Sequence, residues 1–276
     1  MQLQRITSRS NQHVKHARSV RDGISENEIF IEGMRSVREA VAASIEPIAV
    51  YADRQFIERS ESIDLIRTLA QRTTNIYEVE HDVITSISDT RTPQGIVMIA
   101  ARPGPAEVMI KRRMSRSEAT LPIAVYLVGV NNPANLGAVA RAAEAAGAVG
   151  LIVSPESADA FSPKAIRGSM GSLFRLPVWP DASFGEVSNW CSDAGLVLSG
   201  TSLGQAKSYL DVDWNVGRVL VFGSEGHGLH SEYEREFNET LKIPMEPAVE
   251  SLNLAVSCAV MLFEARRSIS SRSGQG

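Results

Sequence analysis

The sequence predicts an α/β protein with two domains, the second of which contains a parallel β-sheet. From residue 121 onward, short segments rich in Val, Ile and Leu alternate with stretches whose apolar residues recur at helical spacing. Strands of a parallel sheet show this pattern because helices cover both faces of the sheet. Before residue 101 the two kinds of segment alternate less regularly, which indicates a smaller mixed domain.

The first domain is expected to span residues 1–105. A helix is predicted directly after Gly33, because Met34, Val37 and Val41 fall on one face at helical spacing. A second helix is predicted over residues 57–69. The apolar runs predict strands at residues 48–51, 76–79 and 96–100.

Residues 106–120 are expected to form a linker, because prolines at positions 103 and 105 precede a basic stretch. The basic residues are Lys111, Arg112, Arg113 and Arg116. After this linker, the second domain is expected to span residues 121–267. The Ser-rich tail, residues 268–276, is expected to be disordered.

In the second domain, a stripe of Leu136, Val139 and Ala140 predicts one helix, and Ser162-Pro163 predicts the start of another. Apolar runs predict strands at residues 123–128, 149–153, 196–199, 219–222 and 241–243. A final helix is expected to bury its apolar stripe in the core. That stripe consists of Leu252, Ala255, Val256, Ala259 and Phe263.

The charge balance does not indicate a globally basic nucleic-acid-binding protein, because 28 basic and 32 acidic residues give a formal net charge of −4. The first 21 residues, however, carry five basic side chains and no acidic one. They are Arg5, Arg9, Lys15, Arg18 and Arg21. This segment is either a basic arm that binds phosphates or a solvated terminus.

Several other classes of protein are disfavoured. The two cysteines, Cys191 and Cys258, are too few for a disulfide framework or a thiolate zinc site, and His227 and His230 lack a third metal ligand. We therefore expect no metal. The longest apolar run has eight residues, whereas a membrane span needs roughly 20. The first residues lack the apolar core of a signal peptide, so we expect a cytoplasmic protein without a membrane partner.

Three polar or glycine-rich segments each follow an expected strand of the second domain. They cover residues 131–141 (NNPANLGAVAR), 222–229 (FGSEGHGL) and 243–257 (IPM, then SLNLAVS). Ligands of open α/β sheets bind at the carboxyl ends of the strands. Their positions after expected strands therefore make all three segments candidates for ligand contacts at this edge.

Taken separately, each segment has a simpler interpretation. Asn135 could cap its helix, Arg141 could form a surface ion pair, and the glycines of residues 223–228 could only form a tight turn. The glycine segment is not a P-loop, since no Gly-Lys-Ser/Thr follows it. No G-x-G-x-x-G opens a helix after a first strand, which argues against a dinucleotide-dependent enzyme.

Taken together, the three segments closely resemble the SpoU/TrmH family of RNA ribose 2′-O-methyltransferases, in the SPOUT superfamily. The matching patterns, in this order, are N-x-G-A-x-x-R, G-S-E-G-x-G-L, and I-P-M followed by S-L-N-x-x-V-S. The resemblance implies a parallel sheet with a deep trefoil knot for residues 121–267. Phe30-Ile31-Glu32-Gly33 and Thr92-Pro93-Gln94-Gly95 also resemble the family's substrate-binding domain, which implies an RNA-binding domain of α/β/α type before it.

The resemblance implies methyl transfer from S-adenosylmethionine to a ribose 2′-hydroxyl. Backbone groups of Gly223, Ile243 and Leu252 would hold the adenine and ribose of this cofactor, and Met245 would form a wall of the pocket. The other cofactor-binding residues would be Thr201, Ser202 and Leu203. Glycine suits position 223 if the backbone has to approach the ligand closely.

Arg141 is the catalytic residue that the resemblance implies, and the family's arginine is often described as a general base. Deprotonation of an arginine at pH 7 costs at least about 7 kcal/mol, because its pKa is near 12.5 or above. We therefore favour a protonated Arg141 that clamps an RNA phosphate and stabilises the developing alkoxide. The residues that would position it and the substrate are Asn135, Glu225, Ser251 and Asn253. In family dimers this arginine reaches the partner's site, so a homodimer is expected.

An RNA substrate would give the basic residues a role, and we expect phosphate contacts from Arg9, Lys15, Arg18 and Arg35. The two-domain layout favours 23S rRNA over tRNA, and some relatives with this layout confer antibiotic resistance. The target is expected to be an unstacked nucleotide, because its 2′-hydroxyl has to be accessible. A tRNA methyltransferase and a catalytically silent RNA-binding ribosome-assembly factor are the alternatives.

Overall fold

The chain forms two compact units in a computed structural model that describes residues 3–115, 121–202, 206–226 and 228–273. Unit 1 consists of Met1–Gly104 and Phe161–Phe174, and unit 2 of Pro105–Ala160 and Arg175–Gly276. The chain therefore enters unit 2, returns to unit 1 for one short segment, and then re-enters unit 2. We expected this short segment to belong to the second domain.

Unit 1 contains a mixed five-stranded sheet. Its strands are β1 (Gln4–Ile6), β2 (Glu28–Glu32), β3 (Pro47–Asp53), β4 (Ile76–Val79) and β5 (Ile96–Ala101). Their order in the sheet is β1-β4-β3-β5-β2. β4 pairs in parallel with β1 and β3, whereas β5 runs antiparallel to β3 and β2.

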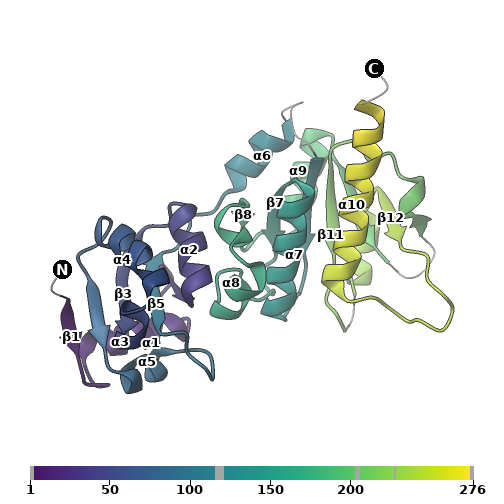
Figure 1. The fold of residues 1–276 in the computed structure, drawn as a ribbon. Helices are drawn as coiled ribbons and strands as arrows, with labels where there is room; N and C mark the ends of the chain where they lie inside the picture. Colours follow the sequence, from purple (N-terminus) through teal and green to yellow (C-terminus); the bar gives the residue numbers. More distant parts are fainter. Residues whose placement is uncertain (1–2, 116–120, 203–205, 227, 274–276) are drawn as a thin grey trace. The chain divides into compact units, whose positions relative to one another are not determined.

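Helices cover both faces of this sheet, which gives the expected α/β/α layers. α1 (Gln12–Arg21) and α5 (His81–Ile87) pack on one face, where Val14 and Ile84 join Phe30 and Tyr51 in the core. α2 (Met34–Ala42) and α4 (Ile63–Ala70) lie on the other face (Figure 1). The remaining helices of the unit are α3 (Arg54–Ile57), η1 (Ser60–Ser62), α8 (Pro163–Ser169) and η2 (Ser172–Phe174).

The basic N-terminal segment is part of this unit and does not form a separate arm. β1 pairs with β4, and Ile6, Val14 and Val20 are buried in the core. Arg5 forms an ion pair with Glu80 at 2.5 Å. The prediction of a basic arm is wrong because this segment carries its own apolar face, which the sheet buries.

Unit 2 contains a seven-stranded sheet. Its strands are β6 (Leu121–Leu127), β7 (Ala148–Val153), β8 (Val178–Trp179), β9 (Val197–Thr201), β10 (Lys207–Ser208), β11 (Arg218–Phe222) and β12 (Glu239–Lys242). Their order is β10-β12-β9-β11-β6-β7-β8, and every neighbouring pair is parallel. The parallel sheet predicted from the apolar segments is therefore confirmed.

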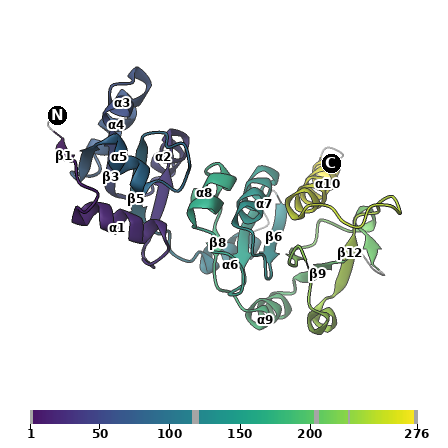
Figure 2. The ribbon, with the colours of Figure 1, turned by 90° about the horizontal axis from the view of Figure 1, so that it is seen from below.

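Two helices cover each face of the parallel sheet (Figure 2). α7 (Pro133–Ala146) and α10 (Leu254–Ser273) lie together on one face, and α6 (Glu107–Ser115) and α9 (Phe184–Ala194) lie on the other. The unit also contains η3 (Tyr209–Asp211) and η4 (Ser231–Glu236). None of the helices in the described ranges has the length and apolar character that crossing a bilayer requires.

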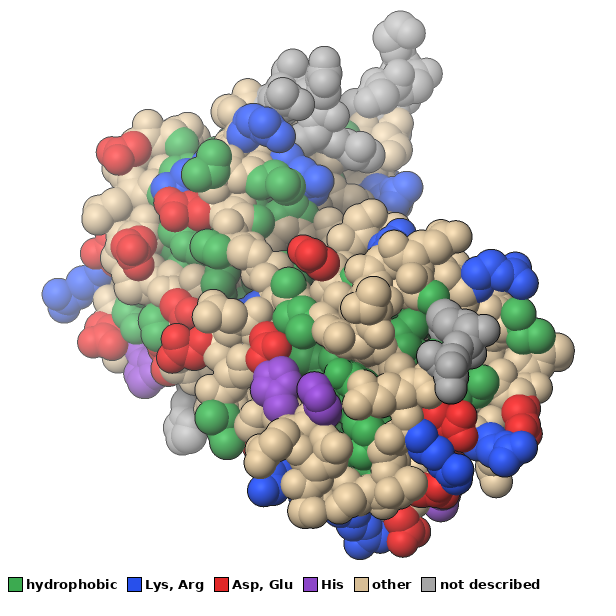
Figure 3. All heavy atoms as spheres, turned by 90° about the vertical axis from the view of Figure 1, so that its left-hand side faces the viewer, with side chains coloured by type: hydrophobic (Ala, Val, Ile, Leu, Met, Phe, Trp, Pro, Cys, Tyr) green, Lys and Arg blue, Asp and Glu red, His purple; other side chains and the backbone are tan. Residues whose placement is uncertain are grey.

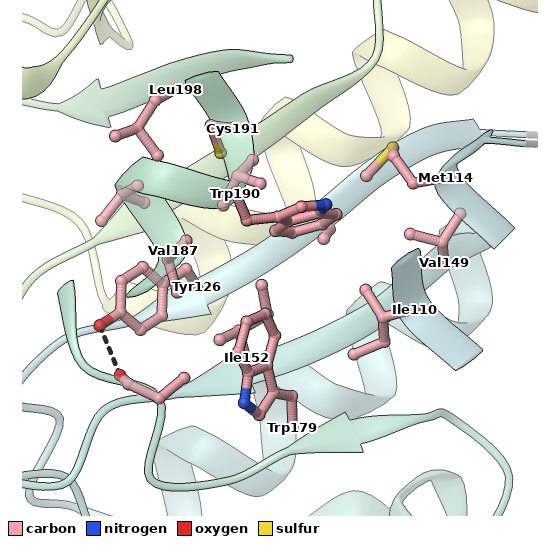
Figure 4. Packing of buried hydrophobic residues seen from close by; sticks show 14 of the residues in the cluster. Ile110, Met114, Tyr126, Val149, Ile152, Trp179, Val187, Trp190, Cys191 and Leu198 are labelled. Atoms are coloured by element: carbon pink, nitrogen blue, oxygen red, sulfur yellow. Dashed lines mark hydrogen bonds between the residues drawn. The ribbon is translucent and has the colours of Figure 1, made fainter. Parts of the chain in front are cut away.

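Helix α6 occupies most of the segment that we expected to be a linker. Its Ile110 is fully buried and packs with Trp179 and Trp190 in the core of unit 2 (Figure 4). A Cβ atom on Gly150 in β7 would lie 2.4 Å from Cγ1 of Ile110, so the helix lies directly on the sheet. The linker prediction is wrong for this helix because its apolar residues belong to the core, and residues 116–120 lie outside the described part.

Helix α10 differs from the expectation at both its end and its buried face. It continues to Ser273, through much of the tail that we expected to be disordered, while residues 274–276 lie outside the described part. Its buried residues are Leu254, Cys258, Met261, Leu262 and Ala265. Leu252 before the helix, and Val256 and Phe263 within it, are exposed instead. Apolar residues occur around the whole helix, so periodicity alone selected the wrong face.

Candidate active site

The carboxyl ends of four neighbouring strands place the three motifs at one edge of the unit 2 sheet. The strands β12, β9, β11 and β6 are adjacent in that order, and all of them are parallel. The first motif follows β6, the glycine-rich motif follows β11, and the third follows β12. Strand β9, between β12 and β11, ends at Thr201. The ends of these parallel strands thus bring the three motifs to one edge of the sheet, as expected from their positions after predicted strands.

The first motif starts with a capped helix. Asn132 is the N-cap of α7, and its Oδ1 accepts a hydrogen bond from the backbone nitrogen of Ala134 at 3.0 Å. Pro133 follows at the first helical position, where its missing N–H has no consequence. Because Asn132 caps the helix, the side chain of Asn135 is free for other contacts, and the simpler interpretation of Asn135 as a cap is wrong.

A polar triad connects all three motifs. Nδ2 of Asn135 donates a hydrogen bond to Oε1 of Glu225 at 2.8 Å, and Nδ2 of Asn253 donates to Oδ1 of Asn135 at 3.2 Å. Oδ1 of Asn253 also accepts hydrogen bonds from the backbone nitrogens of Ala255, at 2.9 Å, and Val256, at 3.4 Å. Residues that are up to 118 positions apart in the chain are thus held in one network.

The glycine-rich motif folds into a tight turn that closes on itself. The backbone of Ser224 and Gly228 forms a two-way bridge, with N–O distances of 3.1 and 2.9 Å. A Cβ atom on Gly223 would lie 2.2 Å from the carbonyl carbon and oxygen of Gly228. Glycine is therefore required at 223 by the chain's own turn, whereas we had expected a close approach of the ligand to require it. The interpretation of these glycines as turn-forming residues is correct, and the turn also presents Glu225.

Two of the expected cofactor residues, Ile243 and Leu252, follow β12 and precede α10. Among the described residues, the backbone amide and carbonyl of Ile243 and of Leu252 have no hydrogen-bond partner. Free donors and acceptors of this kind fit the polar edges of an adenine and a ribose. Oγ1 of Thr201 donates to the carbonyl of Val221 at 3.0 Å, and the nitrogen of Ser202 donates to the carbonyl of Leu241 at 2.9 Å.

Four further residues of the three motifs and of the expected cofactor site remain to be placed. Met245 is half-buried in the segment between β12 and α10, and Ser251 is exposed just before Asn253. His227 in the glycine-rich motif and Leu203 after β9 lie outside the described residues. The structure therefore brings Asn135, Glu225 and Asn253 into direct contact, and places Met245 and Ser251 on the segment that leads from β12 to α10.

Arg141 lies on α7 in the same helix as Asn135, and its side chain is exposed. It forms no hydrogen bond or ion pair with any residue in the described ranges, so the alternative of a surface ion pair is wrong. An unpaired guanidinium keeps all five of its N–H donors available to a ligand. In this it differs from Arg175, whose Nε and Nη2 bind the carboxylate of Glu144 on α7.

The four residues expected to bind RNA in unit 1 fall into two classes. Arg9 pairs with Asp82 at 3.0 Å, and Arg18 donates to the Arg9 carbonyl at 3.1 Å and to Oγ of Ser86 at 2.8 Å. Arg18 thereby joins α1 to α5 and has a structural role. Lys15 and Arg35 are exposed. On the face drawn in Figure 3, basic and acidic side chains are interspersed and form no continuous basic patch.

Sequence reasoning missed two serines that shape the edge. Oγ of Ser154 accepts a hydrogen bond from the backbone nitrogen of Gly129 at 3.1 Å, and Oγ of Ser157 accepts one from that of Val130 at 3.0 Å. Both serines follow β7 and fix the loop that leads from β6 to the first motif. The signal in the sequence was the polar Ser-Pro-Glu-Ser run directly after an expected strand.

Comparisons with known proteins agree with this geometry. The model of the SpoU rRNA Methylase family matches residues 122–263, which is just over half of the chain. The model of the MRM3-like substrate binding domain matches residues 11–98. The two matches correspond to most of unit 2 and most of unit 1.

Curated relatives and solved structures match nearly the whole chain. The 23S rRNA (guanosine(2553)-2'-O)-methyltransferase RlmP of Bacillus subtilis is 26% identical over 96% of this chain and 100% of its own length. The rRNA methyltransferase 3A, mitochondrial, of Danio rerio is 27% identical over 93% of this chain and 67% of its own. The crystal structure of the AdoMet-bound rRNA methyltransferase from Sinorhizobium meliloti has a TM-score of 0.81 and 29% identity, and covers 97% of this chain and 98% of that one.

The sheet order, the three motifs at one edge and the family match lead to the same assignment. The chain belongs to the SpoU rRNA methylase family.

Proposed function

We propose that the protein transfers a methyl group from S-adenosylmethionine to a ribose 2′-hydroxyl of 23S rRNA. The observation that carries the proposal is the polar triad of Asn135, Glu225 and Asn253, which joins three distant motifs at one edge of the sheet. Arg141 lies on the same helix as Asn135 and has no hydrogen-bond or ion-pair partner among the described residues. The relatives support it, since one is named as a 23S rRNA 2'-O-methyltransferase and a similar structure contains AdoMet. The match of unit 1 to a substrate-binding domain supports an RNA substrate.

Some residues of this edge would bind the cofactor, and others would take part in the reaction. When bound, S-adenosylmethionine supplies a methyl group on a positively charged sulfur. The backbone groups of Ile243 and Leu252, which have no hydrogen-bond partner among the described residues, would hold its adenine and ribose. No metal is required for this reaction.

Arg141 acts as a cation in this proposal. Its guanidinium would bind the phosphate next to the target nucleotide and stabilise negative charge on the 2′-oxygen as the proton leaves. The triad positions the reacting groups, because Glu225 and Asn253 fix the amide of Asn135 from both sides. Orientation of this kind is worth several kcal/mol in a transfer between two bound partners.

A homodimer through unit 2 completes the proposal. Val256 and Phe263 on α10 are 48% and 47% exposed, and Leu252, just before the helix, is 37% exposed. A helix that exposes large apolar side chains along one stripe is typical of a surface that another molecule covers. A second copy is the favoured occupant, because the exposed Arg141 lies on α7, which packs against α10. The partner's site would then receive this arginine, as the family resemblance implies.

The proposal also includes a cytoplasmic location and RNA phosphate contacts from Lys15 and Arg35. Both side chains are exposed, so they are accessible to RNA. The deep trefoil knot implied by the family resemblance stays a prediction, as do resistance to an antibiotic and an unstacked target nucleotide.

Incubation with methyl-labelled S-adenosylmethionine and separated rRNA and tRNA fractions tests the proposal. We expect label in the 23S rRNA and none in tRNA. Label in tRNA alone would support the tRNA alternative. Tight cofactor binding without transfer to any RNA would identify a silent RNA-binding factor and contradict the proposal.

A further inference from the structure

A buried carboxylate organises the loop that precedes β5 in unit 1. Glu32, at the end of β2, is only 5% exposed. Its carboxylate accepts hydrogen bonds from the hydroxyl of Ser88, from the backbone nitrogen of Asp89 at 3.0 Å, and from Oγ1 of Thr90 at 2.8 Å. Three consecutive residues are therefore bound to one side chain, and the start of loop 88–95 is fixed.

The counter-charge comes from the short segment that returns to unit 1. Arg167 on α8 binds Asp89, with Nη2 2.6 Å from Oδ2, and its Nη1 lies 3.9 Å from Oε2 of Glu32. The guanidinium of Arg167 thus lies near the carboxylates of both Glu32 and Asp89. These two residues are also joined directly, because the backbone nitrogen of Asp89 donates to Glu32. Without Arg167, the nearly buried carboxylate of Glu32 would lose its nearby positive charge, and Asp89, whose side chain is 37% exposed, would lose the ion pair that ties the loop to α8.

The same loop is held against the start of α2. Oε1 of Gln94 accepts a hydrogen bond from the backbone nitrogen of Met34 at 3.2 Å. Gly33 has a φ of +90°, and a Cβ there would lie 2.9 Å from Oε1 of Gln94. Glycine is needed at 33 for both reasons. The loop and the first turn of α2 are therefore one surface element, and its shape depends on the cluster of Glu32, Asp89 and Arg167.

This surface element presents two basic side chains. Arg91 in the loop and Arg35 in the first turn of α2 are both exposed. In the described ranges neither one forms a hydrogen bond or an ion pair, in contrast to Arg9 and Arg18 near the N-terminus. Two free guanidinium groups on a fixed surface suit the phosphates of an RNA strand.

We infer that Arg167 is a positioning residue for RNA binding: it fixes loop 88–95 against β2, so that Arg91 and Arg35 meet the RNA phosphates together. The inference rests on the proposed function, since it takes RNA as the ligand of unit 1. Arg167 itself pairs with carboxylates and does not contact the RNA. Its effect is on the preorganisation of the binding surface, which lowers the cost of ordering the loop on binding.

The test compares Arg167→Ala with the wild-type enzyme in methyl transfer to 23S rRNA. We expect KM for RNA to rise about tenfold, since an interaction with a charged group is lost. The kcat at saturating RNA and the Kd for S-adenosylmethionine should stay within about twofold. Arg167→Lys should recover part of the loss, because it restores the charge but not the fork of donors. Hydrogen exchange of the loop amides should be faster in Arg167→Ala.

Two further variants control the experiment. Arg67→Ala removes an equally charged side chain from an exposed pair with Asp64 on α4 and should leave KM unchanged. Asp89→Asn removes only the ion pair with Arg167, and it should also raise KM for RNA. It therefore tests the inference even if Arg167→Ala folds poorly. An unchanged KM in both Arg167→Ala and Asp89→Asn would overturn the inference, as would parallel losses of kcat and cofactor affinity.

The outcome is separable from that of the proposed function. Absence of methyl transfer by the wild-type enzyme would contradict the proposed function alone. Filter binding of 23S rRNA without cofactor would then still measure the effect of Arg167. Equal affinities of the wild type and Arg167→Ala in that assay would contradict the inference.

Discussion

Asn253 has two roles that require its two different amide atoms. Its oxygen accepts the free N–H groups at the start of α10, and its nitrogen donates to Asn135. An aspartate could replace the oxygen but not the nitrogen, and it would add a second carboxylate to the network that already contains Glu225. Asn253 therefore couples the start of a helix to the site.

Asn253→Asp should separate these two roles. We expect an unchanged Tm, because aspartate caps a helix as well as asparagine, and a fall in kcat of about tenfold from the lost hydrogen bond. Asn253→Ala should lose the same activity and also about 1 kcal/mol of stability. Thermal unfolding and steady-state kinetics measure the two effects. Equal kcat values for Asn253→Asp and the wild type would show that the bond to Asn135 has no part in catalysis.

Arg141→Ala should lower kcat strongly without weakening the binding of S-adenosylmethionine. The side chain has no partner within the described chain, so we expect normal folding and an unchanged Kd for S-adenosylmethionine. The kcat should fall about 100-fold or more, as for the loss of a charge-stabilising donor. Calorimetric titration and single-turnover kinetics measure these quantities. A fall of less than about threefold, or about 0.7 kcal/mol, would remove Arg141 from the catalytic role.

The sequence motifs identified the residues of the triad, because each motif followed an expected strand and parallel strands end at one edge. The motifs did not reveal which asparagine caps α7, since Asn131, Asn132 and Asn135 all precede or open the helix. Nor could the charge pattern separate the structural Arg18 from the exposed Lys15. That distinction depends on Ser86, which is distant in the sequence and meets Arg18 only in the folded unit.

At the scale of elements, the turn between Gly223 and Gly228 links local geometry to the site. Its backbone bridge brings Glu225 within 2.8 Å of Asn135. A side chain at 223 would have to displace the backbone at 228. The position of Glu225 thus depends on the absence of a Cβ atom two residues before it.

Gly223→Ala should open this turn. We expect a loss of about 1–3 kcal/mol of stability, as for other overpacked positions, and a fall in kcat because Glu225 leaves Asn135. Gly226→Ala is the matched control, since a Cβ there would meet no atom within 4 Å. Denaturant unfolding and steady-state kinetics on both variants check the prediction. Identical behaviour of the two variants would contradict it.

Element by element, the sequence predicted the strands of the parallel sheet best, because their apolar residues are buried on both faces. Within the described part of that sheet it missed β8 and β10, which have two residues each and too little pattern to detect. In the unit 1 sheet it missed β1 and β2. It misjudged α6 because proline and basic residues obscured the buried Ile110. For α10, the exposed stripe was as apolar as the buried one, so the pattern could not show which face meets α7.

At the scale of the whole molecule, the chain order does not match the order of the compact units. Helix α8 follows a strand of unit 2 but packs in unit 1, where Arg167 meets Glu32 and Asp89. The sequence predicted the helix from Ser162-Pro163, but helical periodicity does not show against which of the two sheets the helix packs. The structure gives two physical reasons for this placement: Ala165 and Ile166 of α8 are buried, and Arg167 supplies a counter-charge to the buried Glu32.

A composite dimer predicts complementation between two variants that each have low activity. Arg141→Ala lacks the catalytic arginine, and Gly223→Ala has a disrupted turn. If each site takes its arginine from the partner, mixed dimers contain one site with neither substitution, and mixing should restore activity. Subunit exchange followed by a methyl-transfer assay measures this. Inactive mixtures in which mixed dimers are detected would contradict a shared site.

Mass spectrometry of nucleosides from 23S rRNA treated with the enzyme and S-adenosylmethionine tests the central claim most directly. The account predicts one new 2′-O-methylated nucleoside with the wild type and none with Arg141→Ala. A methyl group on a base, or the same ribose methylation by Arg141→Ala, would contradict it.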